Sequence, residues 1–185
     1  MRKHIFISAV AVVGLAGLAI PASADAKDGG HVRMVRLQDR CDPASFNAAI
    51  GPGTCAPHNG QLINFADFVA ALNMQTHQGS PKWNIHPDMI ELRMGDSISA
   101  SVRGGEFHTF TEVKDFGPGC VALLNGLLGL SGPPAASCAL LATTGTAPGA
   151  PPVMVSGLAP GMHKFMCLIH PWMQAEVMVR AGDDD

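Results

Sequence analysis

The stretch Cys167-Leu168-Ile169-His170-Pro171-Trp172-Met173 decides both the fold and the chemistry predicted for this chain. A strand-like run over residues 163–167 leads into it, and a second one over residues 175–179 follows it. A short loop between two strands therefore carries a thiol, an imidazole and a thioether close together. This combination indicates a metal site at one end of a β-structure.

The cysteine, histidine and methionine of this loop are soft or borderline ligands, the set that selects copper. Two histidines and one cysteine in a plane, with a methionine on a longer axial bond, define the type 1 (blue) copper site of electron-transfer proteins. Cys167, His170 and Met173 supply three of these four ligands. The sequence therefore predicts one type 1 copper ion, with a second histidine supplied from elsewhere in the chain.

His108 is the best candidate for this second histidine. It follows the double-glycine turn Gly104-Gly105 and lies on a strand that can reach the same end of a sandwich. His163 has the same strand parity as Cys167, but it lies four residues before the cysteine and would sit well below the loop. The remaining rivals lie before or at the start of the predicted strands: His31, His58, His77 and His86.

Short strands broken by glycine and proline turns make up the second half of the chain. The predicted strands cover 89–94, 97–102 and 107–113, a strand that begins at 153, and the two strands that flank the loop. This pattern favours an all-β sandwich or barrel. Helical spacing of apolar residues predicts a short amphipathic helix near 64–74, capped by Asn64, and a leucine-rich patch over 121–130 suggests another.

The motifs as a set resemble the cupredoxin family, close to plastocyanin and amicyanin. The resemblance rests on Gly95-Asp96, on Phe107-His108-Thr109-Phe110, and on the segment from Pro160 to Met173, whose C-x-x-H-x-x-M spacing is similar to the amicyanin loop. It covers about residues 82–181. It implies a Greek-key cupredoxin β-sandwich, with His108, Cys167, His170 and Met173 as the copper ligands.

The resemblance also implies roles for residues around the ligands. In the family the ligand histidine of the loop lies at the surface as the electron path, so we expect the same of His170. Trp172 lies between two ligands, and we expect it at the surface, where it either contributes to docking or covers the end of the sandwich. Family members often have tyrosine where His163 stands, and we expect His163 to make the equivalent corner hydrogen bond. The N–H of Thr109 is a candidate donor to the cysteine sulfur.

Five cysteines form an odd set, which in an exported chain indicates disulfides plus one thiol with another task. The local pairs Cys41–Cys55 and Cys120–Cys138 leave Cys167 free for the metal. Four cysteines allow three pairings, and Cys167 as a disulfide partner is the main rival to its role as a ligand.

The N-terminus has the layout of a secretory signal peptide, here assigned to residues 1–24: a short basic head, an apolar run and a small-residue cleavage pattern. An uncleaved anchor is the alternative. We expect a periplasmic or secreted protein with an N-terminal extension over 25–81 that contains the short helix, a cupredoxin domain over 82–181 and an acidic tail over 182–185.

These features predict a one-electron carrier, not an enzyme, because four protein ligands leave no position for a substrate. Cys167 is flanked by Met166 and Leu168, so the adjacent histidine that wires multicopper oxidases and nitrite reductases to a second centre is missing. A net charge of −3 without a basic patch excludes nucleic acid as a partner. We expect a monomer without stable membrane insertion that docks transiently with redox donors and acceptors. The alternatives are copper delivery or storage, and a non-metal binding sandwich.

Overall fold

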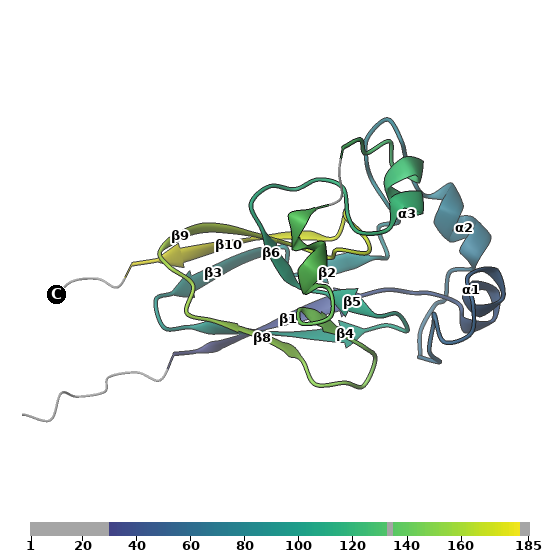
Figure 1. Ribbon diagram of the computed structural model, residues 1–185. Coiled ribbons are helices and arrows are strands. Elements are labelled where there is room, and N and C mark those ends of the chain that lie inside the picture. Colours follow the sequence, from purple (N-terminus) through teal and green to yellow (C-terminus); the bar gives the residue numbers. More distant parts are fainter. Residues whose placement is uncertain (1–29, 133–134, 182–185) are drawn as a thin grey trace, which may run out of the picture.

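The structure, a computed structural model, describes residues 30–132 and 135–181 (Figure 1). The predicted signal peptide and acidic tail lie outside these residues. Two four-stranded sheets pack face to face, with strand orders β2-β1-β4-β8 and β3-β10-β9-β6, and a short third pair joins β5 to β7. The predicted all-β sandwich is confirmed.

The elements of the first sheet are β1 (Val32–Gln38), β2 (Asn84–His86), β4 (Ser97–Arg103) and β8 (Val153–Ser156). Those of the second sheet are β3 (Met89–Arg93), β6 (Thr111–Val113), β9 (Gly161–Met166) and β10 (Gln174–Arg180). The short pair consists of β5 (His108–Thr109) and β7 (Gly145–Thr146). The helices are α1 (Pro43–Ala49), α2 (Phe65–Ala70), α3 (Ala122–Leu127) and the 3-10 turn η1 (Ala136–Leu140).

The two sheets are held together by the buried side chains on the faces that they turn toward each other. Along β10, Ala175, Val177 and Val179 are buried while their neighbours face solvent, the period of two expected for a sheet with one covered face. The rings of Phe110, between β5 and β6, and Phe165, in β9, stack with centroids 4.4 Å apart. The core therefore runs up to the end of β9, where the predicted metal loop begins.

Strand β1 departs from the predicted domain boundaries. It lies inside the range 25–81 that was assigned to an extension, yet it is an inner strand of the first sheet, parallel to β4 and antiparallel to β2. The sandwich therefore begins before residue 82, and residues 39–83, between β1 and β2, lie outside the two sheets. We call this the α1–α2 segment, and we call residues 114–144, which include α3 and η1, the α3 segment.

The helices α1, α2 and α3 gather at one end of the sandwich, on the right in Figure 1, whereas η1 lies beside β6. The predicted helix near 64–74 is present as the shorter α2, and the amide oxygen of Asn64 accepts the backbone N–H of Asp67 as its cap. The helix ends early because the side chain of Asn73 accepts hydrogen bonds from Gln75 N–H and Thr76 N–H and turns the chain. None of the described helices is long and apolar enough to cross a membrane.

Both local disulfides are present, Cys41–Cys55 in the α1–α2 segment and Cys120–Cys138 in the α3 segment. Cys167 is free and buried. The predicted pairing is confirmed, and the rival use of Cys167 as a disulfide partner is excluded in this structure.

Candidate metal centre

The structure brings three of the four predicted ligands together at the helical end of the sandwich. His108 Nδ1 lies 3.7 Å from Cys167 Sγ, and His170 Nδ1 lies 3.8 Å from the same sulfur. These three donor atoms all lie within 4.8 Å of one another, and all three residues are buried. Such a cluster is close enough for one metal ion to bind all three.

The backbone of the loop holds the ligands in register. Cys167 directly follows β9, its N–H donates to the carbonyl oxygen of Met173 at 2.9 Å, and Met173 N–H donates to the carbonyl oxygen of His170 at 2.9 Å. The loop thus closes on itself before β10 begins. Met173, the fourth predicted ligand, is fully buried in the same core cluster as Cys167.

The environment of the cysteine favours the thiolate form. Burial alone would raise the pKa of the Cys167 thiol, but the contacts with His108 and His170 outweigh it and hold that pKa well below its usual range. The backbone N–H of Thr109 also points at the sulfur, 3.5 Å away, as expected. Because the thiolate is the form of cysteine that binds metals, this environment favours binding of a cation.

Each histidine has a carboxylate on the ring nitrogen that faces away from the sulfur. Nε2 of His108 donates to Asp39 at 2.9 Å, and Nε2 of His170 lies 3.6 Å from Glu106. With both Nε2 atoms occupied in this way, both Nδ1 atoms remain for a metal. Neither carboxylate was predicted from the sequence, although the neighbouring turn Gly104-Gly105 was a usable signal.

The expected exposure of His170 is wrong. Only 3% of its surface is accessible, because Phe68 of α2 and Trp172 pack against the imidazole with ring centroids 6.4 Å and 5.2 Å away. Trp172 is itself partly buried, and its indole N–H donates to the carbonyl oxygen of Trp83. The α1–α2 segment therefore covers the histidine that was expected to face a partner. The aromatic spacing of α2 indicated a packing face but not what it would cover.

His163 takes up the corner position expected of it. Its Nε2 donates to the carbonyl oxygen of Ala159 at 2.8 Å, and its Nδ1 donates to Glu112 at 2.6 Å. The Glu112 contact, with the help of Ala159, raises the pKa of His163. His163 lies outside the donor cluster, as predicted from its position four residues before Cys167.

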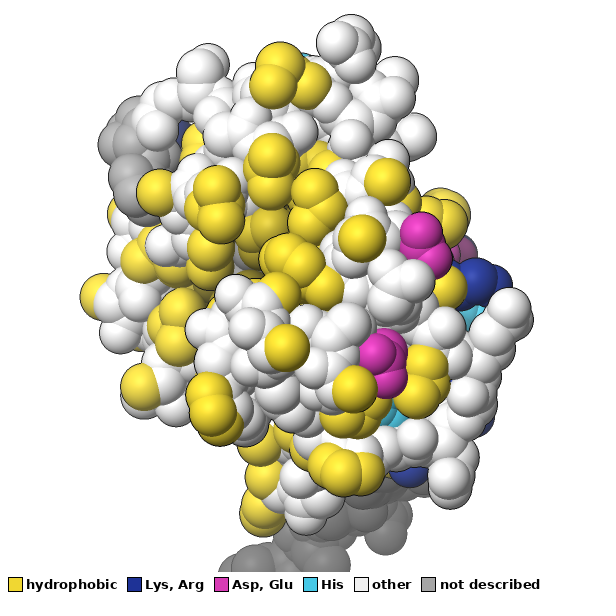
Figure 2. Space-filling model, turned by 90° about the vertical axis from the view of Figure 1, so that its right-hand side faces the viewer, with side chains coloured by type: hydrophobic (Ala, Val, Ile, Leu, Met, Phe, Trp, Pro, Cys, Tyr) yellow, Lys and Arg dark blue, Asp and Glu magenta, His cyan; other side chains and the backbone are white. Residues whose placement is uncertain are grey.

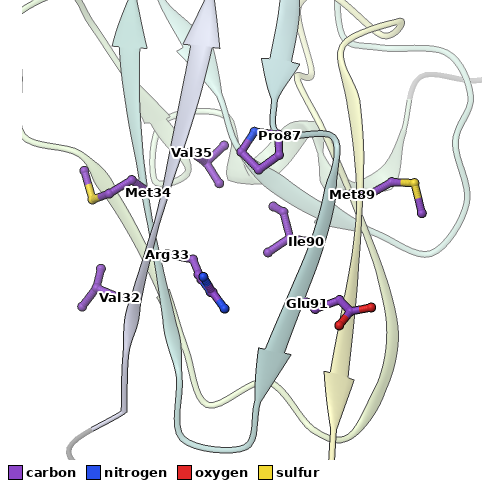
Figure 3. A pocket seen from close by; sticks show the side chains of 8 residues that line it. All are labelled: Val32, Arg33, Met34, Val35, Pro87, Met89, Ile90 and Glu91. Carbon is purple, nitrogen blue, oxygen red and sulfur yellow. The ribbon is translucent and has the colours of Figure 1, made fainter.

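A pocket elsewhere on the molecule is unrelated to these ligands. It lies at the side of the sandwich, between β1 and the stretch from Pro87 into β3, and its charged lining groups are Arg33 and Glu91 (Figure 3). None of the predicted ligands lines it.

No protein-family model matches the chain, and no curated protein matches it in sequence. Among solved structures it is similar to a novel purple cupredoxin from Nitrosopumilus maritimus, at 9% identity over 80% of this chain and 98% of that one, with a TM-score of 0.41. It is also similar to oxidised plastocyanin from Dryopteris crassirhizoma, at 18% identity over 55% and 91% of the two chains, with a TM-score of 0.36.

A third similar structure is pseudoazurin from Methylobacterium extorquens AM1, at 14% identity over 80% of this chain and 75% of that one, with a TM-score of 0.35. At identities this low the similarity concerns the arrangement of strands alone. The strand order of the two sheets, and the loop from Cys167 to Met173 between the antiparallel strands β9 and β10, give this chain a cupredoxin-like β-sandwich fold.

Proposed function

We propose that this protein binds one type 1 copper ion through His108, Cys167, His170 and Met173 and carries single electrons between redox partners. The observation that supports this most directly is the approach of both histidine Nδ1 atoms to the buried sulfur of Cys167. Two imidazoles, a thiolate and a neighbouring thioether form the ligand set of blue copper electron-transfer sites. Copper bound there would supply the Cu(II)/Cu(I) couple.

The protein holds the ligands in fixed positions and excludes water from the site. Cys167 and His170 are fixed by the hydrogen bonds that close the loop, and His108 is fixed by its pairing with Thr146 of β7. Ligands that cannot move reorganise little when an electron arrives, so transfer is fast. The buried donors also keep water and small oxidants away from the site.

The covered His170 moves the docking surface outward, onto the segments that overlie it. Hydrophobic side chains gather on this end of the molecule (Figure 2). The exposed large hydrophobic residues of the two segments are Ile50, Leu62, Met74, Leu123 and Leu140. Small, partly apolar interfaces suit transient redox complexes. In this proposal a partner docks on the segments, and the electron crosses the Trp172 and Phe68 rings that lie over His170.

Copper delivery is the alternative function. It requires an ion that leaves readily for another protein, and the burial of all three donor residues opposes rapid release. The carrier function requires only that the electron leave. The two functions therefore differ in the rate at which a strong Cu(I) chelator removes the metal.

The first test is the visible spectrum of the purified protein after addition of Cu(II), followed by ascorbate and by reoxidation. We expect an intense blue band that bleaches and returns. Cys167→Ala should lose the band and keep the fold, judged by far-ultraviolet circular dichroism. A blue Cys167→Ala protein would contradict the ligand assignment, as would a colourless wild type.

The second set of tests asks whether Met173 is the axial ligand and distinguishes electron transfer from copper delivery. Met173→Leu should remain coloured and show a higher reduction potential, because a weak donor that favours Cu(II) is lost. An unchanged potential would show that Met173 is not a ligand. Loss of copper to a Cu(I) chelator within seconds, in place of slow loss over hours, would favour delivery over electron transfer.

A further inference from the structure

This inference rests on the proposed function and concerns the two carboxylates behind the histidines. We propose that Asp39, and more weakly Glu106, are positioning residues that lower the reduction potential of the bound copper by making His108 and His170 stronger donors to Cu(II). Neither carboxylate is among the three donor atoms of the cluster formed by His108, Cys167 and His170. Each acts through the outer nitrogen of one ligand histidine.

Asp39 is held as a fully buried anion. Its carboxylate accepts hydrogen bonds from the backbone N–H groups of Cys41, Gly105 and Glu106, at 3.3, 2.9 and 3.1 Å, besides the one from His108. All four partners are donors, which only an ionised carboxylate can accept in full. The carboxylate therefore has one position and one charge state against the imidazole.

Two glycines make this arrangement sterically feasible. A Cβ at Gly104 would lie 2.0 Å from Asp39 Oδ2, and one at Gly105 would lie 2.7 Å from the sulfurs of both Cys41 and Cys55. The first disulfide, the carboxylate and the turn before β5 thus pack in direct contact. The turn Gly104-Gly105 is needed for Asp39 to reach His108.

Glu106 is held less tightly. Its carboxylate accepts a hydrogen bond from the indole N–H of Trp83 and lies 3.6 Å from His170 Nε2, beyond ordinary hydrogen-bond distance. Glu106 is buried with 6% of its surface exposed. A carboxylate at this distance acts mainly through its field, so its effect on His170 is smaller than that of Asp39 on His108.

Both contacts favour oxidised copper. A carboxylate on the outer N–H of a ligand histidine fixes the tautomer and raises the basicity of the other nitrogen. A stronger donor and a nearby buried negative charge stabilise Cu(II) more than Cu(I), because the charge difference is felt strongly where water is excluded. The potential of this protein should thus lie below that of the same site without the carboxylates.

The decisive experiment is cyclic voltammetry of copper-loaded wild type, Asp39→Asn and Glu106→Gln, with Cu(II) and Cu(I) affinities measured by chelator competition. Loss of such a partner costs about 10–100-fold in metal affinity. If the loss falls on Cu(II), Asp39→Asn raises the potential by about 60–120 mV, at 59 mV per tenfold for one electron. Glu106→Gln should raise it less, and both variants should stay blue.

Glu112→Gln is the matched control, because it removes a carboxylate from His163, a histidine outside the cluster. Its potential should equal that of wild type. A blue Asp39→Asn protein with an unchanged potential and an unchanged Cu(II) to Cu(I) affinity ratio would overturn the inference. If Asp39→Asn does not fold, an unchanged potential in Glu106→Gln would overturn it. A colourless wild type would instead refute the proposed function.

Discussion

The α1–α2 segment and the helix α3 of the α3 segment lie at the same end of the sandwich (Figure 1), but the two segments are built differently. The first reaches the site with buried side chains, namely the ring of Phe68, which packs on His170, and the carboxylate of Asp39, which accepts a hydrogen bond from His108. The second reaches the metal loop through its backbone, with Cys120 N–H donating to the carbonyl oxygen of Leu168 at 2.6 Å. A side-chain contact can be deleted by mutation and a backbone contact cannot, so the two segments should differ in mutational sensitivity.

The segments also stabilise themselves differently. In the α1–α2 segment the ring of Phe68 lies 5.3 Å from Phe46 and 4.6 Å from Trp83, a buried aromatic cluster. In the α3 segment the Asn125 amide accepts from Gly119 N–H and donates to the carbonyl oxygen of Gly119, at 2.8 and 2.9 Å. The first is held mainly by this aromatic packing, whereas the second combines these polar contacts and its disulfide with apolar packing, including the fully buried Leu128.

The largest expected difference in stability is between loss of the buried ring of Phe68 and loss of the exposed side chain of Leu123. Phe68→Ala removes a side chain that packs on Phe46, Trp83 and His170, and should lower the free energy of unfolding by about 3–5 kcal/mol. Leu123→Ala, at a residue 71% exposed in α3, should change it by less than about 0.5 kcal/mol. Urea denaturation of both variants measures this, and equal losses would break the comparison.

The two disulfides provide the next test. They join residues 14 and 18 apart, for which loop entropy predicts similar losses of about 3 kcal/mol. The double variant Cys41→Ala/Cys55→Ala should lose more stability than Cys120→Ala/Cys138→Ala. The reason is that only the first pair is fully buried, so its removal also leaves a cavity. Thermal unfolding and the blue band give the two readouts. If the second pair costs more, packing around the first disulfide is unimportant.

Two glycines should give effects of opposite sign. A Cβ at Gly79 would lie 2.0 Å from the indole of Trp172, so Gly79→Ala should push the α1–α2 segment away and cost about 1–3 kcal/mol. A Cβ at Gly126 in α3 meets nothing within 4 Å, so Gly126→Ala should stabilise by about 0.5–1 kcal/mol through helix propensity. Denaturant midpoints check both signs. A stable Gly79→Ala protein would show that the cover over His170 is loose.

The smallest effect is expected outside both segments. The folded-state pKa of His163 is raised, so the stability from its contact with Glu112 is present below the unfolded pKa near 6.5 and is lost as pH rises through the folded pKa. At pH 5.5 the free energy of unfolding of wild type should therefore exceed that of Glu112→Gln by about 0.2–1 kcal/mol. At a pH well above the folded pKa the difference should vanish. Urea unfolding at both pH values measures it, and a constant difference would exclude protonation of His163 as the cause.

Much of the sandwich could be predicted from the sequence because its information is local. The strands of the second half, the Asn64 cap and both disulfides follow from period-two alternation, turn residues and short spacings. His108 was chosen because it follows the Gly104-Gly105 turn on a strand that can reach the same end of the sandwich, and its imidazole does lie near the sulfur of Cys167. The place of β1 was missed because its partners β4 and β2 lie far along the chain, and a strand pattern does not name its neighbours.

The surroundings of the site were harder to predict for the same reason. Asp39 reaches His108 across 69 residues, and Phe68 covers His170 from a separate helix. Nothing in the spacing near Asp39 or Phe68 names these targets. The helix α1 had local signals that were overlooked, since Asp42 caps it and Pro43 occupies its first turn.

The cover over His170 also makes the protein its own optical reporter. The chain has two tryptophans and no tyrosine, so Trp83 and Trp172 account for nearly all of its ultraviolet emission. Trp172 lies 5.2 Å from the His170 ring, and Trp83 donates to the carboxylate beside that histidine. A blue absorber at the site would quench both by energy transfer. Fluorescence intensity should thus follow metal loading and oxidation state with almost no background from the rest of the molecule.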